Sequence, residues 1–270
     1  MSKVNVNAIE PSTGTDITLG ASGDTINIPS GVTIANSGTA TGFGAALTGS
    51  TNNTVTTVTA ANAITGEAKL LFDPPKLTIG NASEEDTSLV FDGHAQDYYI
   101  GLDDSEDDLV IGLGSAVGTT AHMVFDEAGC VTKPLQPAFL TDKDSTQSMS
   151  TGGYTYVTYE SNREIFDQNA DYNTGTYTFT APVTGKYFLS FSSRNDSIAS
   201  TKLMNIRIVT SNRNYQMDCG GSSPETSQGT LAVIADMDAS DTAYCASTTD
   251  GATETWNLLS GSWFSGALIC

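Results

Sequence analysis

The stretch Tyr172–Phe191 constrains the fold of this chain more than any other part of the sequence. Large apolar side chains recur there at every second position on both sides of Ala181–Gly185, a segment with the Pro and Gly of a turn. A two-residue period places alternate side chains on opposite faces of a β-strand. We therefore predict a hairpin of two antiparallel strands. Its inward positions are Tyr177, Phe179, Tyr187, Leu189 and Phe191, and its other face carries Phe188, Ser190 and Ser192.

The same stretch belongs to a longer pattern. Phe166-Asp167 precede it, and Ser262–Leu268 (SWFSGAL) stands near the end of the chain. In this order and spacing, the pattern resembles the globular head of complement C1q and its tumour-necrosis-factor-like relatives. The resemblance covers residues 133–270, and it implies a jelly-roll sandwich, a tight homotrimer and a last strand near the threefold axis. One departure is Ala239–Asp241, which stands where the family usually has a Gly-Asp turn.

Composition divides the chain near residue 130. Residues 131–270 hold 16 aromatic residues and can build a core, because each buried aromatic or aliphatic side chain contributes about 1.5–3 kcal/mol. The first 66 residues hold only 15 large apolar side chains, so either other copies of the chain supply burial or the segment is disordered. We predict three domains, all rich in β-structure. They are an N-terminal attachment or fibre segment (1–66), an acidic shaft module (67–132) and a C1q-like jelly-roll head (133–270).

Charge excludes one class of partner. The chain has 31 Asp and Glu against 11 Lys and Arg, a formal net charge of −20. Nucleic acid is excluded because the sequence has no basic stripe to replace the counterions of phosphate. Beyond a Debye length of about 8 Å, the chain gains no attraction to an anionic cell surface either. Contact with a cell must then use short-range chemistry or bridging cations.

The N-terminal segment has a low-complexity composition. No charged residue occurs from Thr25 to Gly66, a composition of either a flexible linker or an extended fibre. The alternation at Val55 and Val58 favours the fibre, and a helix is conceivable only near Ala60–Leu71. Residues 13–34 hold three short apolar alternations between Gly-rich turns, at Ile17/Leu19, Ile26/Ile28 and Val32/Ile34. Residues 13–34 resemble the opening segment of predicted tail-fibre proteins of marine bacteriophages.

The middle of the chain contains an internal repeat. Leu89–Gly93 (LVFDG) is similar to Met123–Gly129 (MVFDEAG), and Ile100–Asp103 is similar to Ile111–Gly114. Four or more short strands joined by turns are predicted for residues 77–129. This block resembles fibre-shaft modules of phage structural proteins.

Beyond this module, Lys133–Pro137 carries two prolines and is predicted to be an extended junction between domains. Alternating apolar runs then recur at the spacing of a β-sandwich. Since the resemblance places the last strand at the axis, Phe264→Asp is expected to abolish the trimer. The predicted strands are Tyr154–Tyr159, Thr176–Thr180, Lys186–Ser192, Lys202–Thr210, Leu231–Ala235, Thr242–Ala246 and Trp263–Ile269.

Two features of the middle module offer metal ligands, but neither predicts a site. Asp103–Asp108 carries the carboxylates that hard cations prefer, yet it has Asp108 and Gly114 where an EF-hand has Gly and Glu. A solvated hairpin turn is the preferred interpretation. His94 and His122 could bind an ion on a threefold axis, but they lack an HxH spacing, so packing or surface roles are preferred. No metal and no cofactor are predicted.

No catalytic residue is predicted either. Residues 133–270 contain no histidine that could serve as a general base. Four acids could supply a glycosidase pair, but their spacing is that of a loop between strands. They are Glu160, Glu164, Asp167 and Asp171.

Loops are the expected binding elements. Tyr, Asn and Ser residues in Ser211–Tyr215 and Gly220–Gly229 could contact a glycan or protein receptor. The four cysteines are expected to be free thiols, although Cys219 and Cys245 could pair and four cysteines allow three connectivities. The N-terminus lacks the pattern of a signal peptide, and no long apolar run is present. We therefore expect no membrane insertion.

These features predict a homotrimeric virion protein, a phage tail fibre assembled in the host cytoplasm. Its N-terminal part would bind phage tail or adaptor proteins, and its C1q-like tip would adhere to a host glycan or protein receptor. The alternatives are a carbohydrate-degrading tail-spike enzyme and a non-viral C1q-like adhesin.

Overall fold

In the residues that it describes, the structure, a computed structural model, contains only β-strands as regular elements. Within the described residues the predicted all-β fold class is confirmed. The chain divides into two compact units, Met1–Thr78 and Ile79–Cys270. The domain boundaries at residues 66 and 132 stay predictions, and the alternations between residues 17 and 34 lie outside the described residues. The described residues are 13, 46–48, 54–60, 63–150, 152–221, 226–250 and 255–270.

The described part of the first unit is a four-stranded sheet. β3 pairs in parallel with β1, in antiparallel fashion with β2, and also with β4. The strand predicted around Val55 and Val58 is present as β2. The helix considered near Ala60–Leu71 is wrong, because pairing in β3 overrides the helix propensity of its Ala, Leu and Lys residues. The strands are β1 (Ala46–Thr48), β2 (Thr54–Ala60), β3 (Ala63–Asp73) and β4 (Lys76–Ile79).

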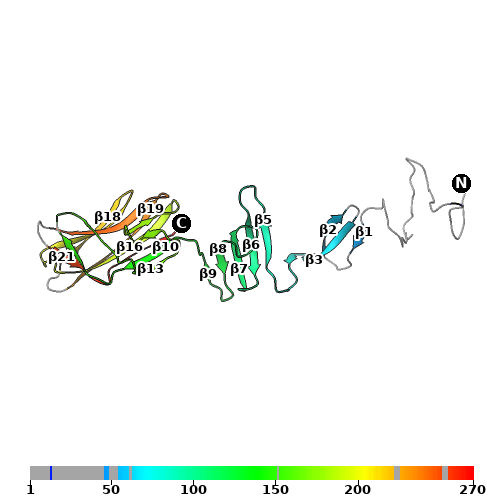
Figure 1. The fold of residues 1–270 in the computed structure, drawn as a ribbon, viewed down its shortest axis with the longest axis horizontal. Helices are drawn as coiled ribbons and strands as arrows, with labels where there is room; N and C mark the ends of the chain where they lie inside the picture. Colours follow the sequence, from blue (N-terminus) through cyan, green and yellow to red (C-terminus); the bar gives the residue numbers. More distant parts are fainter. Residues whose placement is uncertain are drawn as a thin grey trace. The chain divides into compact units, whose positions relative to one another are not determined.

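The middle sheet is a five-stranded antiparallel meander, in which strands adjacent in sequence pair with each other (Figure 1). The internal repeat has a direct structural meaning, because Ile100 of β6 is the register partner of Ile111 of β7. The short strands predicted for residues 77–129 are therefore present. They are β5 (Thr87–Phe91), β6 (Tyr98–Asp103), β7 (Asp108–Leu113) and β8 (Ala121–Phe125), followed by β9 (Val131–Thr132).

One face of the middle sheet packs against residues 114–120, the loop between β7 and β8. Tyr99 is fully buried there, and its hydroxyl accepts a hydrogen bond from the Gly118 amide at 3.1 Å. A Cβ at Gly112 would lie 2.4 Å from the Tyr99 hydroxyl oxygen, and one at Gly101 would lie 2.5 Å from a loop side chain. The two glycines of the repeated Ile-Gly-Leu segment thus let the loop approach the sheet closely.

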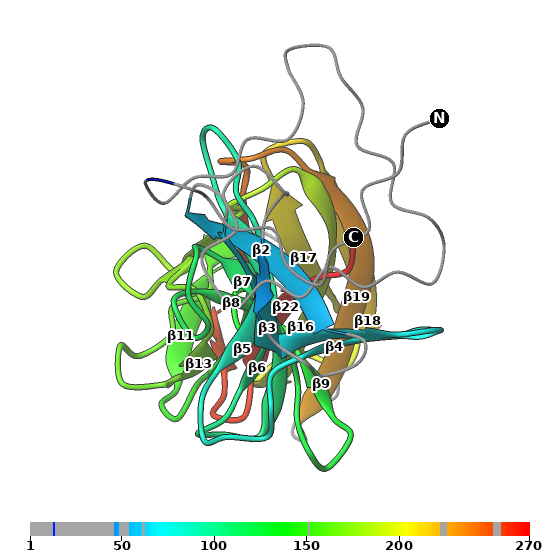
Figure 2. The ribbon, with the colours of Figure 1, turned by 90° about the vertical axis from the view of Figure 1, so that its right-hand side faces the viewer.

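The head is a sandwich of two antiparallel sheets. The first has the strand order β11-β21-β16-β22-β10-β13, with β19 paired to β16; the second has the order β14-β15-β20-β17-β18, with β12 paired to β20. From β15 onward the chain crosses repeatedly between the sheets, and only β17–β18 and β21–β22 are consecutive strands of one sheet. This is jelly-roll connectivity and confirms the predicted head fold. Figure 2 shows the twist of β19, which pairs with β16 over its whole length.

The strands of the head are these. The first sheet contains β10 (Ala138–Asp142), β11 (Gln147–Ser150), β13 (Glu164–Asp167), β16 (Gly185–Asp196), β19 (Ser227–Met237), β21 (Thr255–Leu258) and β22 (Trp263–Leu268). The second contains β12 (Thr155–Tyr156), β14 (Tyr172–Asn173), β15 (Thr178–Thr180), β17 (Leu203–Thr210), β18 (Asn214–Gly220) and β20 (Thr242–Thr249).

The predicted hairpin over Tyr172–Phe191 is wrong, although both of its strands exist. β15 pairs with β14 and β20, whereas β16 pairs with β19, β21 and β22. Residues 181–184 therefore carry the chain from one sheet to the other. Tyr177 is not a strand residue, because it lies in the turn before β15 with a φ of 58°.

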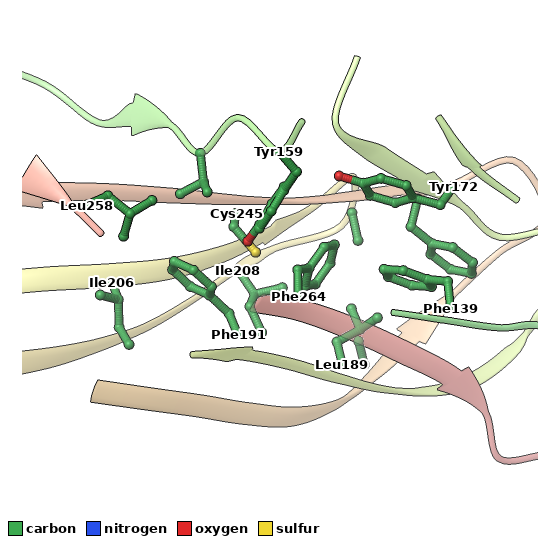
Figure 3. Close-up of a cluster of buried hydrophobic side chains, with 14 of the residues drawn as sticks. Phe139, Tyr159, Tyr172, Leu189, Phe191, Ile206, Ile208, Cys245, Leu258 and Phe264 are labelled. Carbon is green, nitrogen blue, oxygen red and sulfur yellow. The ribbon is translucent and has the colours of Figure 1, made fainter. Parts of the chain in front are cut away.

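Aromatic rings from both sheets form the centre of the core (Figure 3). Phe139 stacks on Tyr172 with ring centroids 5.1 Å apart and on Phe179 at 4.8 Å, and it meets the edge of Phe264 at 5.0 Å. Such pairs contribute about 0.5–1.5 kcal/mol each beyond their buried area. The predicted inward face of β16 is confirmed by the full burial of Tyr187, Leu189 and Phe191.

Phe264 points into this core, so the prediction that it faces a threefold axis is wrong. The pleat of β22 places its neighbour Trp263 on the outer face instead. Gly266 shares the inner face with Phe264, and a Cβ there would lie 2.6 Å from the ring of Phe139. An aspartate at position 264 would therefore act on the folding of the head.

The junction between β9 and β10 is a turn and not the predicted extended segment. The Gln136 amide donates a hydrogen bond to the Lys133 carbonyl at 3.0 Å. Pro134 occupies the second position of this turn, where its fixed φ is favourable. The two prolines thus mark a chain reversal.

Candidate functional site

The second face of the middle sheet is apolar on all five strands. Residues paired across antiparallel strands share a face, and the register therefore aligns its side chains in rows that contain no charged residue. Seven of its large side chains are between 40% and 54% exposed in the single chain. They are Leu89, Phe91, Tyr98, Ile100, Leu102, Leu109 and Val131, and together with Ile111, Leu113, Met123 and Phe125 they define the middle-sheet apolar face.

The head has a second surface of this kind, on the outer face of its first sheet. One row runs across four strands as Ile234, Phe188, Ala267 and Ala138. The next runs as Ala232, Ser190, Ser265, Leu140 and Phe166. Neither row contains a charge, and Ile234 is 61% exposed. These two rows, with Trp263 beside them, define the head apolar face.

Contiguous uncharged faces of this kind are candidate association surfaces, because large exposed apolar patches mark interaction sites on soluble proteins. Sequence reasoning located contacts in loops and did not identify these faces. The sequence does hold one indication of the head apolar face. Phe188, Ser190 and Ser192 alternate with the core positions of their strand and carry no charge, although the outer face of a strand is usually polar. Ser190 and Ser192 are in fact buried, whereas Phe188 is exposed.

Four acids were considered as possible members of a glycosidase pair. Two of them, Glu160 and Asp167, accept hydrogen bonds from neighbouring groups. Glu160 accepts a hydrogen bond from Lys143 Nζ at 2.9 Å and another from Ser145. Asp167 accepts hydrogen bonds from the amides of Asp171 at 3.1 Å and Tyr172 at 2.7 Å. These bonds tie both carboxylates to the frame of the head.

The surroundings of Glu160 and Asp171 shift the pKa values of these two carboxyl groups in opposite directions. Burial would raise the pKa of Glu160, but the hydrogen bonds from Ser145 and Lys143 outweigh it and lower this pKa to about 2. Burial, with a smaller effect of Asp167, raises the pKa of Asp171 to about 6. Glu164 lies exposed on β13.

Replacing Glu160 by Gln is expected to destabilise the head by about 1–3 kcal/mol, because the Lys143 ammonium is almost fully buried and loses its charged acceptor. Since the folded pKa of Glu160 is below its ordinary value of 4.5, its contribution is present above pH 4.5 and is lost as the pH falls toward 2. Urea unfolding at a series of pH values measures both effects. Glu164→Gln is the control and should leave stability and its pH dependence unchanged; equal behaviour of the two variants would contradict the prediction.

The acidic segment Asp103–Asp108 forms the predicted hairpin turn between β6 and β7. Asp103 accepts a hydrogen bond from the Ser105 hydroxyl at 2.7 Å, and Asp107 has a φ of 58°. Burial, with neighbouring acids, raises the pKa of Asp108. Within the described ranges, no group of three or more His, Cys, Asp or Glu side chains is placed to hold a metal ion.

The two histidines lie on different elements of the middle module. His122 is on β8, where its ring meets the edge of Tyr98 at 6.0 Å. His94 is exposed in the loop between β5 and β6. The packing and surface roles preferred from the sequence match these positions.

The loops expected to bind a receptor are partly strands. Ser211–Arg213 is a turn, but Asn214 and Tyr215 begin β18. Gly220 ends β18, residues 227–229 belong to β19, and residues 222–225 lie outside the described residues. Cys219 and Cys245 are free, as are Cys130 and Cys270.

The part of the chain that the structure describes contains no helix long and apolar enough to cross a membrane.

No protein-family model matches this chain, and the search of curated proteins finds no match either. Solved structures do match its C-terminal half. The globular domain of zebrafish complement 1qA is 16% identical, with a TM-score of 0.38, and the match covers 50% of this chain and 98% of that chain. Murine APRIL is 11% identical with a TM-score of 0.38, covering 50% and 99%. Eiger TNF from S. frugiperda is 11% identical with a TM-score of 0.35, covering 50% and 92%.

Proposed function

We propose that this protein is a homotrimeric tail fibre of a bacteriophage, a virion structural protein whose jelly-roll head adheres to the host surface. The N-terminal segment attaches to tail or adaptor proteins, and the middle sheet forms the shaft. The chain acts by binding and not by catalysis.

The middle-sheet apolar face is the observation that carries the proposal. A single chain leaves this face partly in water. Because its large side chains are about half exposed, completing their burial gains about half of the roughly 1.5–3 kcal/mol of a full transfer for each of them. Three identical faces turned toward one axis bury all of them. The opposite face is already covered by residues 114–120 of the same chain. In the proposed trimer, one face of each middle sheet therefore packs against its own chain and the other face packs against the two partner chains.

The head supports the same assembly. Its apolar face lies on one outer side of the sandwich, and the C1q and TNF-like proteins that its sequence resembles form homotrimers. One threefold axis therefore accounts for two uncharged faces on two separate sheets. A monomeric depolymerase would leave both faces exposed, and Glu160 and Asp167 are engaged in structural bonds. The phage role rests on the resemblance of the N-terminal and middle segments to fibre proteins.

Light scattering coupled to size-exclusion chromatography tests the assembly. The full-length chain is expected to elute with three times the chain mass of 28.2 kDa at micromolar concentration. Negative-stain images of the same sample are expected to show a thin rod ending in a knob. A well-folded monomer would overturn the fibre proposal, and a compact trimer without a rod would leave a C1q-like adhesin as the better reading.

A further inference from the structure

The outer face of the second head sheet carries a cluster of aromatic and polar side chains. Tyr154 and Tyr156 come from β12 and the residue before it, Asn205 and Arg207 from β17, and Tyr244 from β20. The register places them together, since Tyr156 pairs with Ala246, and Ala246 pairs in turn with Arg207. We call these five residues the tyrosine platform.

Ring contacts hold the side chains of the tyrosine platform together. Tyr156 and Tyr244 stack with centroids 4.4 Å apart and planes inclined by 20°, and their hydroxyls lie 3.0 Å apart. The Arg207 guanidinium carbon lies 3.4 Å from the centroid of the Tyr154 ring. Tyr156 nonetheless remains 53% exposed.

Planar hydrogen-bonding groups border the rings. The Tyr154 hydroxyl donates to Asn205 Oδ1 at 2.6 Å, and the Asn205 amide donates to Asp218. Arg207 Nη2 donates to Gln216 Oε1 at 2.7 Å. Amide, carboxylate and guanidinium groups thus lie beside an exposed aromatic ring, and the charges of Arg207 and Asp218 are opposite.

The tyrosine platform stays accessible in the proposed assembly. The two sheets of a sandwich turn their outer faces in opposite directions, and the head apolar face belongs to the first sheet while the platform belongs to the second. A trimer formed through the first sheet therefore presents three copies of the platform to solvent.

We propose that the tyrosine platform is a binding site for neutral glycans. This inference rests on the proposed function and assigns the receptor class of the adhesive head. The apolar C–H face of a pyranose ring packs on the exposed ring of Tyr156, as apolar ligand surfaces pack on the rigid aromatic side chains of other binding sites. Its hydroxyls, each a donor and an acceptor, then meet the amides, the carboxylate and the guanidinium beside the ring.

Charge selects the class of sugar. The platform has one positive side chain, Arg207, the negative Asp218 lies beside it, and the chain as a whole has a net charge of −20. An acidic sugar would be repelled within the Debye length, whereas a neutral sugar pays no such cost. Flat sites of this kind bind a single sugar weakly, and three copies on one trimer raise the avidity by about 10²–10⁴.

Saturation-transfer NMR on the intact full-length protein tests the proposal. The probes are the methyl glycosides of glucose, galactose and N-acetylglucosamine at millimolar concentration, with N-acetylneuraminic acid as the charged comparison. At least one neutral glycoside is expected to bind and the charged sugar is not. Tyr156→Ala is expected to weaken binding at least about tenfold, whereas Tyr156→Phe, which keeps the ring, should retain most of it.

Asn214→Ala on the neighbouring strand of the same face is the matched control and should bind as the wild type does. An intact trimer that binds none of the neutral glycosides overturns the glycan proposal and leaves the fibre proposal standing. Binding that is equal for the charged sugar, or unchanged in Tyr156→Ala, also overturns it. A monomer that still binds through Tyr156 would instead overturn the fibre proposal alone.

Discussion

An Ile100→Asp substitution is expected to convert the proposed trimer into monomers whose middle sheet is unfolded. Ile100 stands at the centre of the middle-sheet apolar face, between Leu89 and Ile111 in the register. Its loss removes about 1.5–3 kcal/mol of burial per chain, and the trimer loses this three times. Three carboxylates would also be brought together in an uncharged interior, which costs more than the lost burial. Light scattering measures the mass, and limited proteolysis reports the state of the middle module.

Gln96→Asp supplies the matched control, because it adds the same charge in the exposed loop between β5 and β6. This variant should remain trimeric with an unchanged melting temperature. If Ile100→Asp also stays trimeric and equally stable, the middle-sheet apolar face is not the assembly surface.

A Phe264→Asp substitution is expected to unfold the head. Phe264 is fully buried against Phe139 and Tyr172. Truncation of a buried Phe costs about 3–5 kcal/mol, and a buried carboxylate without a partner adds to this cost. Near-ultraviolet circular dichroism of the full-length chain should lose its aromatic signal.

Leu203→Asp is the control for this experiment, because Leu203 is exposed on the outer face of β17. It should preserve the spectrum and the melting curve. A Phe264→Asp protein with a native aromatic spectrum and only a changed mass would instead restore the idea that this residue faces the axis.

The sequence predicts strands well where one face is apolar and the other polar. In β16, the alternation of Tyr187, Leu189 and Phe191 identifies the inward positions, and all three are fully buried. The strands that pair with β16 could not be predicted in this way. An alternating pattern shows which face of a strand is buried but does not show which strand lies next to it. Residues 181–184 are as short as a hairpin loop, yet they join two sheets.

The direction of Phe264 could not be predicted for a related reason. Trp263 and Phe264 are adjacent and both large and apolar, so the period of two fits either choice of inner face. The decision is made in three dimensions, where Gly266 leaves room for the ring of Phe139 on the side of Phe264.

The binding surfaces depend even more on tertiary structure. Tyr156 and Tyr244 are 88 positions apart in the chain, and only the pairing of β12 with β20 brings their rings into contact. The middle-sheet apolar face arises from side chains that each look like ordinary core residues. Sequence alone cannot show that these side chains remain partly exposed on one face of the folded sheet.

The one-sided middle sheet has a consequence for the order in which the trimer forms. The head has a complete core within one chain, so it can fold as soon as it is synthesised. In the proposed trimer, by contrast, the middle-sheet apolar face is covered only when three copies meet. Once three heads associate, the junction at residues 133–137 holds the three middle segments at an effective concentration of about millimolar. Their association then becomes an intramolecular step. Assembly should therefore proceed from the C-terminus toward the N-terminus, opposite to the direction of synthesis.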